Sequence, residues 1–96
     1  MDEAEVLLSQ LAADQLADLS PSLGRSMGRS LLLLGNFPES GSPVSQDGYE
    51  LYRQLLVSQF RAIYRYFPDE HKVRVYCILH TRRTLPPSEF LTYQQF

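Results

Sequence analysis

The chain lacks most of what several large protein classes require. Its one cysteine, Cys77, excludes an internal disulfide, so packing must hold the fold and a reducing environment is expected. The longest purely aliphatic run, Leu31 to Leu34, is far shorter than the ~20 residues that cross a bilayer. We therefore expect no transmembrane or signal segment and no membrane partner. Clustered Cys, His or carboxylate ligands and glycine-rich nucleotide loops are also missing, which predicts no metal and no cofactor.

What is present fits one ordinary globular domain spanning residues 1–96. Hydrophobic residues make up 44% of the sequence and charged residues 21%, enough apolar material for a packed core. The net charge of −2 hides an uneven distribution. Residues 1–50 hold eight acids and two arginines, a balance of −6, whereas residues 51–96 hold seven bases and three acids, a balance of +4. A small total argues against strong non-specific nucleic-acid binding, but the basic half allows one local site for a phosphate.

The first third of the chain is predicted to form two helices. In residues 2–19 the apolar residues recur at the three- and four-residue spacing of an amphipathic helix. Ser20-Pro21 is typical of an N-cap and first helical residue, and it starts a second helix that ends near Gly35-Asn36. So short a link predicts an antiparallel helical hairpin. Gly24 and Gly28 favour close approach to another backbone over phosphate binding, because no strand precedes them.

The second half is predicted to be a sheet. A turn-rich connector, residues 38–48, precedes three segments rich in aromatic and aliphatic residues, 49–56, 60–67 and 73–80. Their short links predict a three-stranded antiparallel β-meander packed on the helical hairpin, so the fold class is α+β. After Pro86-Pro87, residues 88–96 are expected to form a short C-terminal helix or tail.

Alternation along these strands predicts a sheet with one apolar and one basic face. Val73, Val75, Cys77 and Leu79 are expected to share the face that rests on the helices, with Cys77 as core filler. The opposite face is expected to gather arginines and His80 around tyrosines, from these residues: Arg61, Ile63 and Arg65 on one strand, and Arg74, Tyr76, Ile78 and His80 on the next.

Such a face has two readings of equal weight. Guanidinium groups pair with phosphate and aromatic rings stack on bases, which suits single-stranded RNA or a phosphate-rich surface. Alternatively, the arginines simply lie over tyrosines on a solvated face. His80 is the one side chain here able to exchange a proton near neutral pH, and Arg82 and Arg83 beside it favour a neutral imidazole that could act as a base. A lone histidine at a strand end is nevertheless more often structural.

The element order and local residues together resemble the RelE/ParE toxin superfamily, the growth-inhibiting halves of bacterial type II toxin–antitoxin pairs. The matching segments are the helical hairpin, the connector and three motifs: Tyr49-Glu-Leu-Tyr-Arg53, Phe60-Arg-Ala-Ile-Tyr64 and Val73-Arg-Val-Tyr-Cys-Ile-Leu-His-Thr-Arg-Arg83. The second motif is similar to the family's aromatic-Arg-x-aliphatic-Tyr strand. The third is similar to its closing strand, which ends in a His or basic cluster.

This resemblance implies roles for particular residues. Arg61 takes the place of the arginine that contacts the scissile phosphate in ribosome-dependent, mRNA-cleaving members. His80 and Arg83 fall where such members place a general acid/base or a second phosphate-binding cation. These three are the catalytic candidates, and the candidates for binding the substrate or target are the other polar residues of the basic half: Arg53, Arg65, Arg74, Tyr76 and Arg82.

Two departures from the family pattern affect these expectations. The lysines that many cleaving members carry on the first hairpin strand are absent, and the Ile-Leu-His-x-Arg-Arg ending is more similar to the ParE branch, whose members poison DNA gyrase without cleaving nucleic acid. Members also usually begin with a β-strand, whereas this chain is predicted to start directly in a helix. A sheet edge would then be uncovered, where a partner strand could pair.

The leading hypothesis is therefore a cytoplasmic bacterial toxin that inhibits growth through its basic sheet face, with either the translating ribosome and its mRNA or DNA gyrase as target. A cognate antitoxin would neutralise it, and a homo-oligomer or a hetero-oligomer with the antitoxin is compatible with this. The alternative is a non-toxic, degenerate family member that acts as a protein-interaction module. A simple RNA-binding domain is a third reading, which predicts binding that weakens steeply with salt.

Overall fold

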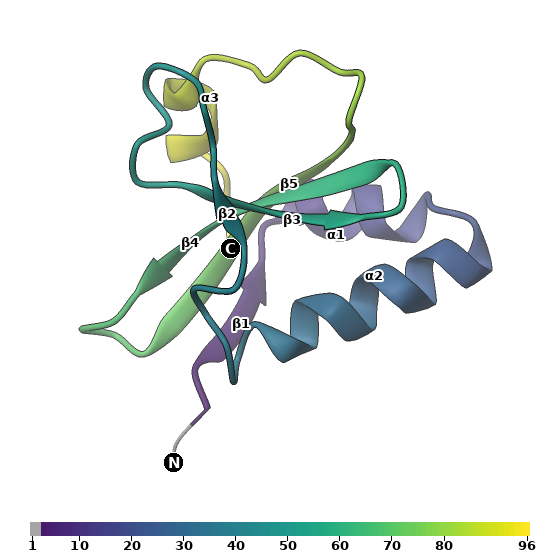
Figure 1. Cartoon of the computed structure of the whole chain (residues 1–96), viewed down its shortest axis with the longest axis horizontal. Helices are drawn as coiled ribbons and strands as arrows, with labels where there is room; N and C mark the ends of the chain where they lie inside the picture. The colour runs from purple at the N-terminus through teal and green to yellow at the C-terminus, as the bar shows by residue number, and fades with distance from the viewer. Residues whose placement is uncertain (1–2) are drawn as a thin grey trace.

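A computed structural model describes residues 3–96 as a mixed five-stranded sheet with three helices (Figure 1). The strand order is β1-β5-β4-β3-β2. The elements, in chain order, are β1 (Glu5–Leu8), α1 (Gln10–Ala17), α2 (Pro21–Leu33), β2 (Ser42–Pro43), β3 (Arg53–Val57), β4 (Phe60–Phe67), β5 (Lys72–His80) and α3 (Ser88–Thr92). No helix in this part of the chain is long and apolar enough to cross a membrane.

The first element is a strand, so the prediction of a helix over residues 2–19 is wrong at its start; Asp2 lies outside the described residues. β1 pairs in parallel with β5, with Glu5 opposite Lys72. The predicted uncovered edge of β5 is therefore covered by β1. The helix begins only after Ser9, whose hydroxyl caps it by accepting the Ala12 N–H at 2.9 Å. The spacing of the apolar residues suggested one continuous helix. A short strand followed directly by a helix can also place apolar residues three or four positions apart.

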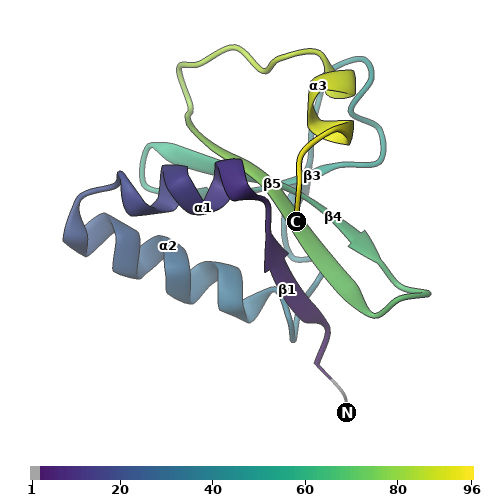
Figure 2. The ribbon, with the colours of Figure 1, turned by 180° about the vertical axis from the view of Figure 1, so that it is seen from behind.

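The two predicted helices are present as α1 and α2, and both lie on one face of the sheet (Figure 2). Ser20-Pro21 starts α2 as predicted, with Ser20 as N-cap and proline in the first turn. The glycines behave differently from each other. A Cβ on Gly24 would lie 3.8 Å from the Leu16 carbonyl of α1, an ordinary contact, whereas a Cβ on Gly28 would meet nothing within 4 Å. Close backbone approach therefore does not account for Gly28.

The α+β class is confirmed, but the three predicted strands form only the central part of the sheet. β4 has the predicted bounds, and β5 starts one residue earlier than expected. β3 begins at Arg53 rather than at residue 49, because Tyr49 is buried just after the connector and donates its hydroxyl to the Pro86 carbonyl at 2.6 Å. The antiparallel order β3-β4-β5 agrees with the prediction. β1 and β2 were not predicted.

A β-bulge in β5 changes the two faces of the sheet. Ile63 of β4 lies opposite Cys77, but the next residue, Tyr64, lies opposite Val75. Tyr76 is thus the extra residue, and an extra residue reverses the side-chain alternation on either side of it. Val75 packs with the helices as predicted, whereas Cys77 packs on the opposite face. The expectation that both belong to one apolar face is wrong.

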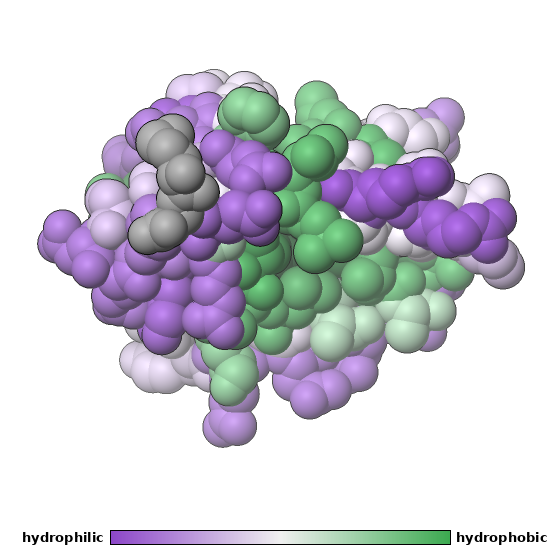
Figure 3. Space-filling model, turned by 90° about the horizontal axis from the view of Figure 1, so that it is seen from below, coloured by the Kyte–Doolittle hydropathy of each residue, from purple (hydrophilic) through white to green (hydrophobic). Residues whose placement is uncertain are grey.

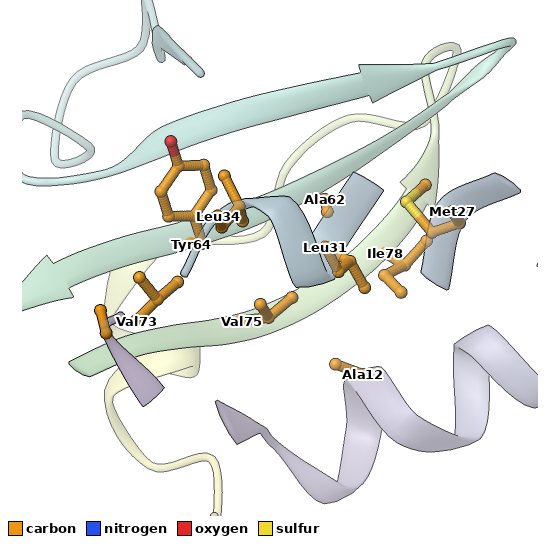
Figure 4. Close-up of a cluster of buried hydrophobic side chains, with 10 residues drawn as sticks. Ala12, Met27, Leu31, Leu34, Ala62, Tyr64, Val73, Val75 and Ile78 are labelled. Atoms are coloured by element: carbon orange, nitrogen blue, oxygen red, sulfur yellow. The ribbon is translucent and has the colours of Figure 1, made fainter. Parts of the chain in front are cut away.

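Each face of the sheet has its own core. The core under α1 and α2 is shown in Figure 4 and contains Met27 and Leu31 from α2, and Leu34 just after it, against the following sheet residues: Ala62, Tyr64, Val73, Val75 and Ile78. The second core lies under the connector and α3, and its members include Tyr49, Tyr52, Ile63, Tyr76, Cys77, Leu85 and Leu91. The predicted basic face is therefore largely covered, because the connector and the C-terminal residues pack against it.

Candidate functional site

Arg61 lies on β4 and holds the turn that follows β5. Its Nη2 donates to the Arg83 carbonyl at 2.8 Å, and its Nη1 donates to Gln54 Oε1 at 3.3 Å. The Nε atom is buried and has no hydrogen-bond partner. All the acceptors of this guanidinium are neutral, and no ion pair of Arg61 is found among residues 3–96. Within residues 3–96, no carboxylate therefore pairs with the Arg61 guanidinium beside the turn at residues 81–83.

His80 ends β5, and its ring has fixed partners. Nδ1 accepts the backbone N–H of Arg82 at 3.1 Å, and Nε2 lies 3.3 Å from Gln59 Oε1. Because a backbone N–H can only donate, Nδ1 is the acceptor and the ring hydrogen lies on Nε2, where it can be donated to Gln59. The ring also packs edge-on against Phe60, with 5.2 Å between centroids.

The three catalytic candidates lie near one another in space but do not share one face of the sheet. His80 is opposite Phe60, which packs on the helix side, whereas Arg61 is opposite Leu79, which packs on the other side. His80 and Arg83 line a cavity of about 360 Å³ whose wall includes Asp18 of the segment after α1. Arg61 reaches Arg83 only through the backbone carbonyl. The predicted grouping of Arg61 with His80 on one basic face is wrong, because the bulge reverses the end of β5.

Arg65 and Arg74 lie together on the face opposite the helices. They are direct cross-strand partners in β4 and β5. The Arg65 guanidinium carbon lies 4.5 Å from the centre of the Phe67 ring and 5.6 Å from that of Tyr52. The Arg74 guanidinium carbon lies 4.9 Å from the same Phe67 centre. The structure thus brings these two binding candidates together, at the opposite end of β4 from Arg61.

The remaining binding candidates are separate. Arg53 donates to the Gly41 carbonyl at 2.7 Å and pairs with Glu39 at 3.7 Å, at the edge of a cavity of about 440 Å³. Arg82 is exposed in the turn after β5. Tyr76 is only 6% exposed, and burial is the main cause that raises the pKa of its phenol. Tyr76 is therefore a core residue rather than a contact for a ligand.

Other chemistries have little support. Burial raises the pKa of the Cys77 thiol to about 12, although the nearby Arg61 charge opposes this. A thiol that stays protonated at neutral pH is a poor nucleophile. Within residues 3–96 no group of three or more His, Cys, Asp or Glu side chains is placed to hold a metal ion.

Sequence reasoning missed the residues that position these side chains. Gln54 and Gln59 contact Arg61 and His80, and the carbonyl of Gln59 also accepts the Thr81 N–H at 2.8 Å. Glutamine carries no charge or periodic signal, so composition did not mark either residue. The pairing of β3 with β4 around the turn at Ser58-Gln59 was the available clue, because it brings residue 54 diagonally across from residue 61.

The architecture is similar to that of chains in solved toxin and toxin–antitoxin structures. The M. tuberculosis toxin–antitoxin complex RelBE2 contains a chain that superposes with a TM-score of 0.73 over 81% of this chain and 98% of that one, at 18% identity. The isolated E. coli RelE toxin superposes with a TM-score of 0.69 over 93% of this chain and 96% of that one, at 15% identity. The chain has the fold of the RelE toxins.

The intact E. coli RelBE toxin–antitoxin complex gives the same result, with a TM-score of 0.70 over 83% of this chain and 99% of the matched chain, at 12% identity. A scan against protein-family models and a search of curated proteins by sequence each give no match. At these identities, the resemblance to the RelE/ParE superfamily is confirmed as a likeness to the RelE fold, and it extends over most of the chain.

Proposed function

We propose that this protein is the toxin of a type II toxin–antitoxin module, that it acts in the cytoplasm, and that a cognate antitoxin neutralises it. The observation that carries the proposal is the RelE fold, shared over at least four fifths of the chain with toxins solved alone and in complexes with an antitoxin. β1 is present and covers the sheet edge at which an interaction module could have paired with a partner strand. The proposal is therefore better supported than that alternative.

Exposed apolar side chains agree with a protein partner. Leu32 is 71% exposed and Leu33 55% exposed at the end of α2, and Phe37 is 61% exposed just beyond it. Figure 3 shows a contiguous hydrophobic area across the middle of the face seen from below, a face that includes α2. Contiguous exposed apolar area of this kind is typical of protein interaction sites. We expect the antitoxin to cover part of it.

For the action on the target, we propose binding rather than RNA cleavage. General acid–base cleavage needs one group to take a proton and another to give one near the same phosphate. His80 would have to give up the hydrogen bond from Arg82 to be protonated at Nδ1, and it lies on the opposite face of the sheet from Arg61. This geometry argues against a nuclease mechanism that uses Arg61, His80 and Arg83, and we propose gyrase-type binding in its place.

The test of toxicity is induction in a bacterial host with and without the neighbouring gene. We expect arrest by the chain alone and relief when the neighbour is co-expressed. Growth that continues normally while soluble protein accumulates would refute the toxin proposal and leave the interaction module.

Sequencing of cellular transcripts after induction separates the mechanisms. We expect no ribosome-phased cleavage, and we expect arrest to persist in the His80→Gln variant, in which the ring is lost. Arg29→Gln, at an exposed position of α2, is the matched control for effects of a substitution that are unrelated to the candidate site. Phased cleavage that disappears in His80→Gln and in Arg61→Ala would establish the nuclease mechanism instead.

A further inference from the structure

Two arginines face each other directly across the β4–β5 pair, an arrangement that needs a physical reason. Arg65 and Arg74 are in register, so their Cβ atoms lie about 4.5–5.5 Å apart. Like charges in directly opposed positions destabilise a sheet. Something on this face must offset the repulsion between the two guanidinium groups.

Aromatic rings supply part of that compensation. Phe67 contacts both guanidinium groups, Tyr52 adds a ring for Arg65, and Phe96 adds one for Arg74 at 5.7 Å. The Phe96 ring in turn packs edge-on against Tyr76 at 5.0 Å. Such contacts stabilise a cation and hold its side chain in place, but they leave the charge itself unneutralised.

The charges of the cluster do not balance. Glu70 pairs with Arg74 at 3.2 Å, and no ion pair of Arg65 is found within residues 3–96. Arg74 is only partly exposed, at 33% of its side chain, and its buried Nε has no hydrogen-bond partner. The cluster therefore holds one positive charge in excess, on side chains that are already ordered and partly desolvated. An anion meets stronger attraction and a smaller ordering loss here than at a free surface arginine.

We propose that the Arg65–Arg74 pair is a docking site for a carboxylate on an acidic and apolar segment of a protein partner. The neighbouring residues favour a protein, since Phe96 is 48% exposed beside the pair and Tyr93, three residues earlier, is 81% exposed. Arginine with aromatic rings is the usual composition of energetically important positions in protein interfaces. Nucleic acid, by contrast, needs several phosphate contacts, whereas this cluster has a single excess charge and the chain a net charge of −2.

The site can be tested in vitro, independently of growth inhibition. The probe is a blocked peptide of alternating glutamate and leucine, titrated into ¹⁵N-labelled protein while the arginine Nε–H resonances are followed. We expect the resonances of Arg65 and Arg74 to shift together and saturate, while those of Arg25 and Arg29 stay unchanged. The matching glutamine–leucine peptide should leave all four unchanged, because it carries no carboxylate.

Variants then separate charge from geometry by calorimetric affinity. Arg65→Gln should weaken binding of the acidic peptide about tenfold, as expected for a lost charged hydrogen bond. Arg65→Lys should restore only part of that affinity, because an ammonium cannot bind a carboxylate through two parallel N–H groups. Arg29→Gln, which alters net charge equally, should have no effect. Thermal unfolding of each variant verifies that the fold is retained.

Three results would overturn the proposal: wild-type Arg65 and Arg74 resonances that do not respond to the acidic peptide, equal losses in Arg65→Gln and Arg29→Gln, or an oligouridine strand that shifts the same resonances and binds more tightly than the peptide. The last would assign the site to RNA. Because growth is not measured here, a protein that binds the peptide yet leaves bacteria unharmed would contradict only the toxin proposal.

Discussion

Replacing Ser9 by alanine should be among the most destabilising changes to a small side chain in this protein. Ser9 is fully buried where β1 turns into α1. Its hydroxyl donates to the Tyr76 carbonyl at 2.7 Å and accepts the Ala12 N–H at 2.9 Å. One oxygen thus caps α1 and also satisfies the carbonyl of the bulged residue of β5. The helix under the sheet and the bulge within it depend on the same side chain.

The magnitude follows from these two hydrogen bonds. Loss of a serine N-cap costs about 1 kcal/mol. A buried carbonyl left without a donor adds about 1–3 kcal/mol. The variant Ser9→Ala should therefore lose about 2–4 kcal/mol, out of a total near 5–15 kcal/mol for a domain of this kind. At about 4–8 °C per kcal/mol, the midpoint of thermal unfolding should fall by at least about 8 °C.

Thermal and urea unfolding, followed by circular dichroism, would measure this loss. Ser20→Ala is the matched control, because Ser20 is the N-cap of α2 but is exposed and makes no side-chain capping bond. It should change the free energy of unfolding by less than about 0.5 kcal/mol. If the two variants lost equal stability, the dual role of the Ser9 hydroxyl would be wrong.

Three further changes test other parts of the structure. Tyr64→Phe should cost about 1–3 kcal/mol in urea unfolding, because the buried hydroxyl accepts the Gly41 N–H at 2.9 Å and donates to the Pro38 carbonyl at 2.8 Å; a neutral result would contradict this. Gly41→Ala should cost about 1–3 kcal/mol or more, since the new Cβ would lie 2.7 Å from the Gln54 carbonyl, and a stable variant would show that the connector can move. Burial raises the pKa of Cys77 from 9.0 to about 12, so its contribution to stability is complete below pH 9 and is lost as the pH rises to about 12. The fall in unfolding free energy over that range should be shallower in Cys77→Ala, and an identical slope would refute the assignment.

The sequence predicted those elements whose signals are local. Ser20-Pro21 marked the start of α2, and aromatic and β-branched residues marked β4 with the observed bounds. β1 was missed because its four residues, Glu5 followed by three apolar residues, are too few to show either strand alternation or helical spacing. What makes it a strand is its pairing with β5, more than sixty residues away.

The candidate site was predictable as a list of residues and not as an arrangement. The alternation of side chains along the two predicted strands correctly indicated that Arg65 and Arg74 face the same way. Perfect alternation then placed His80 beside them, which the extra residue at Tyr76 makes wrong. The bulge could not be predicted from the composition of β5. The carbonyl of its extra residue, Tyr76, accepts a hydrogen bond from Ser9, which is far away in the chain.

By itself, the sequence determined the α+β class, the antiparallel order of the three central strands, and the separation of an acidic half from a basic half, because spacing, caps and charge act between near neighbours. The tertiary structure decided which arginines come together, which face His80 occupies, and that the connector and C-terminal residues cover most of the predicted basic face. Those outcomes depend on pairing register and on buried hydrogen bonds between residues far apart in the chain, and a single substitution at Ser9 is expected to perturb both.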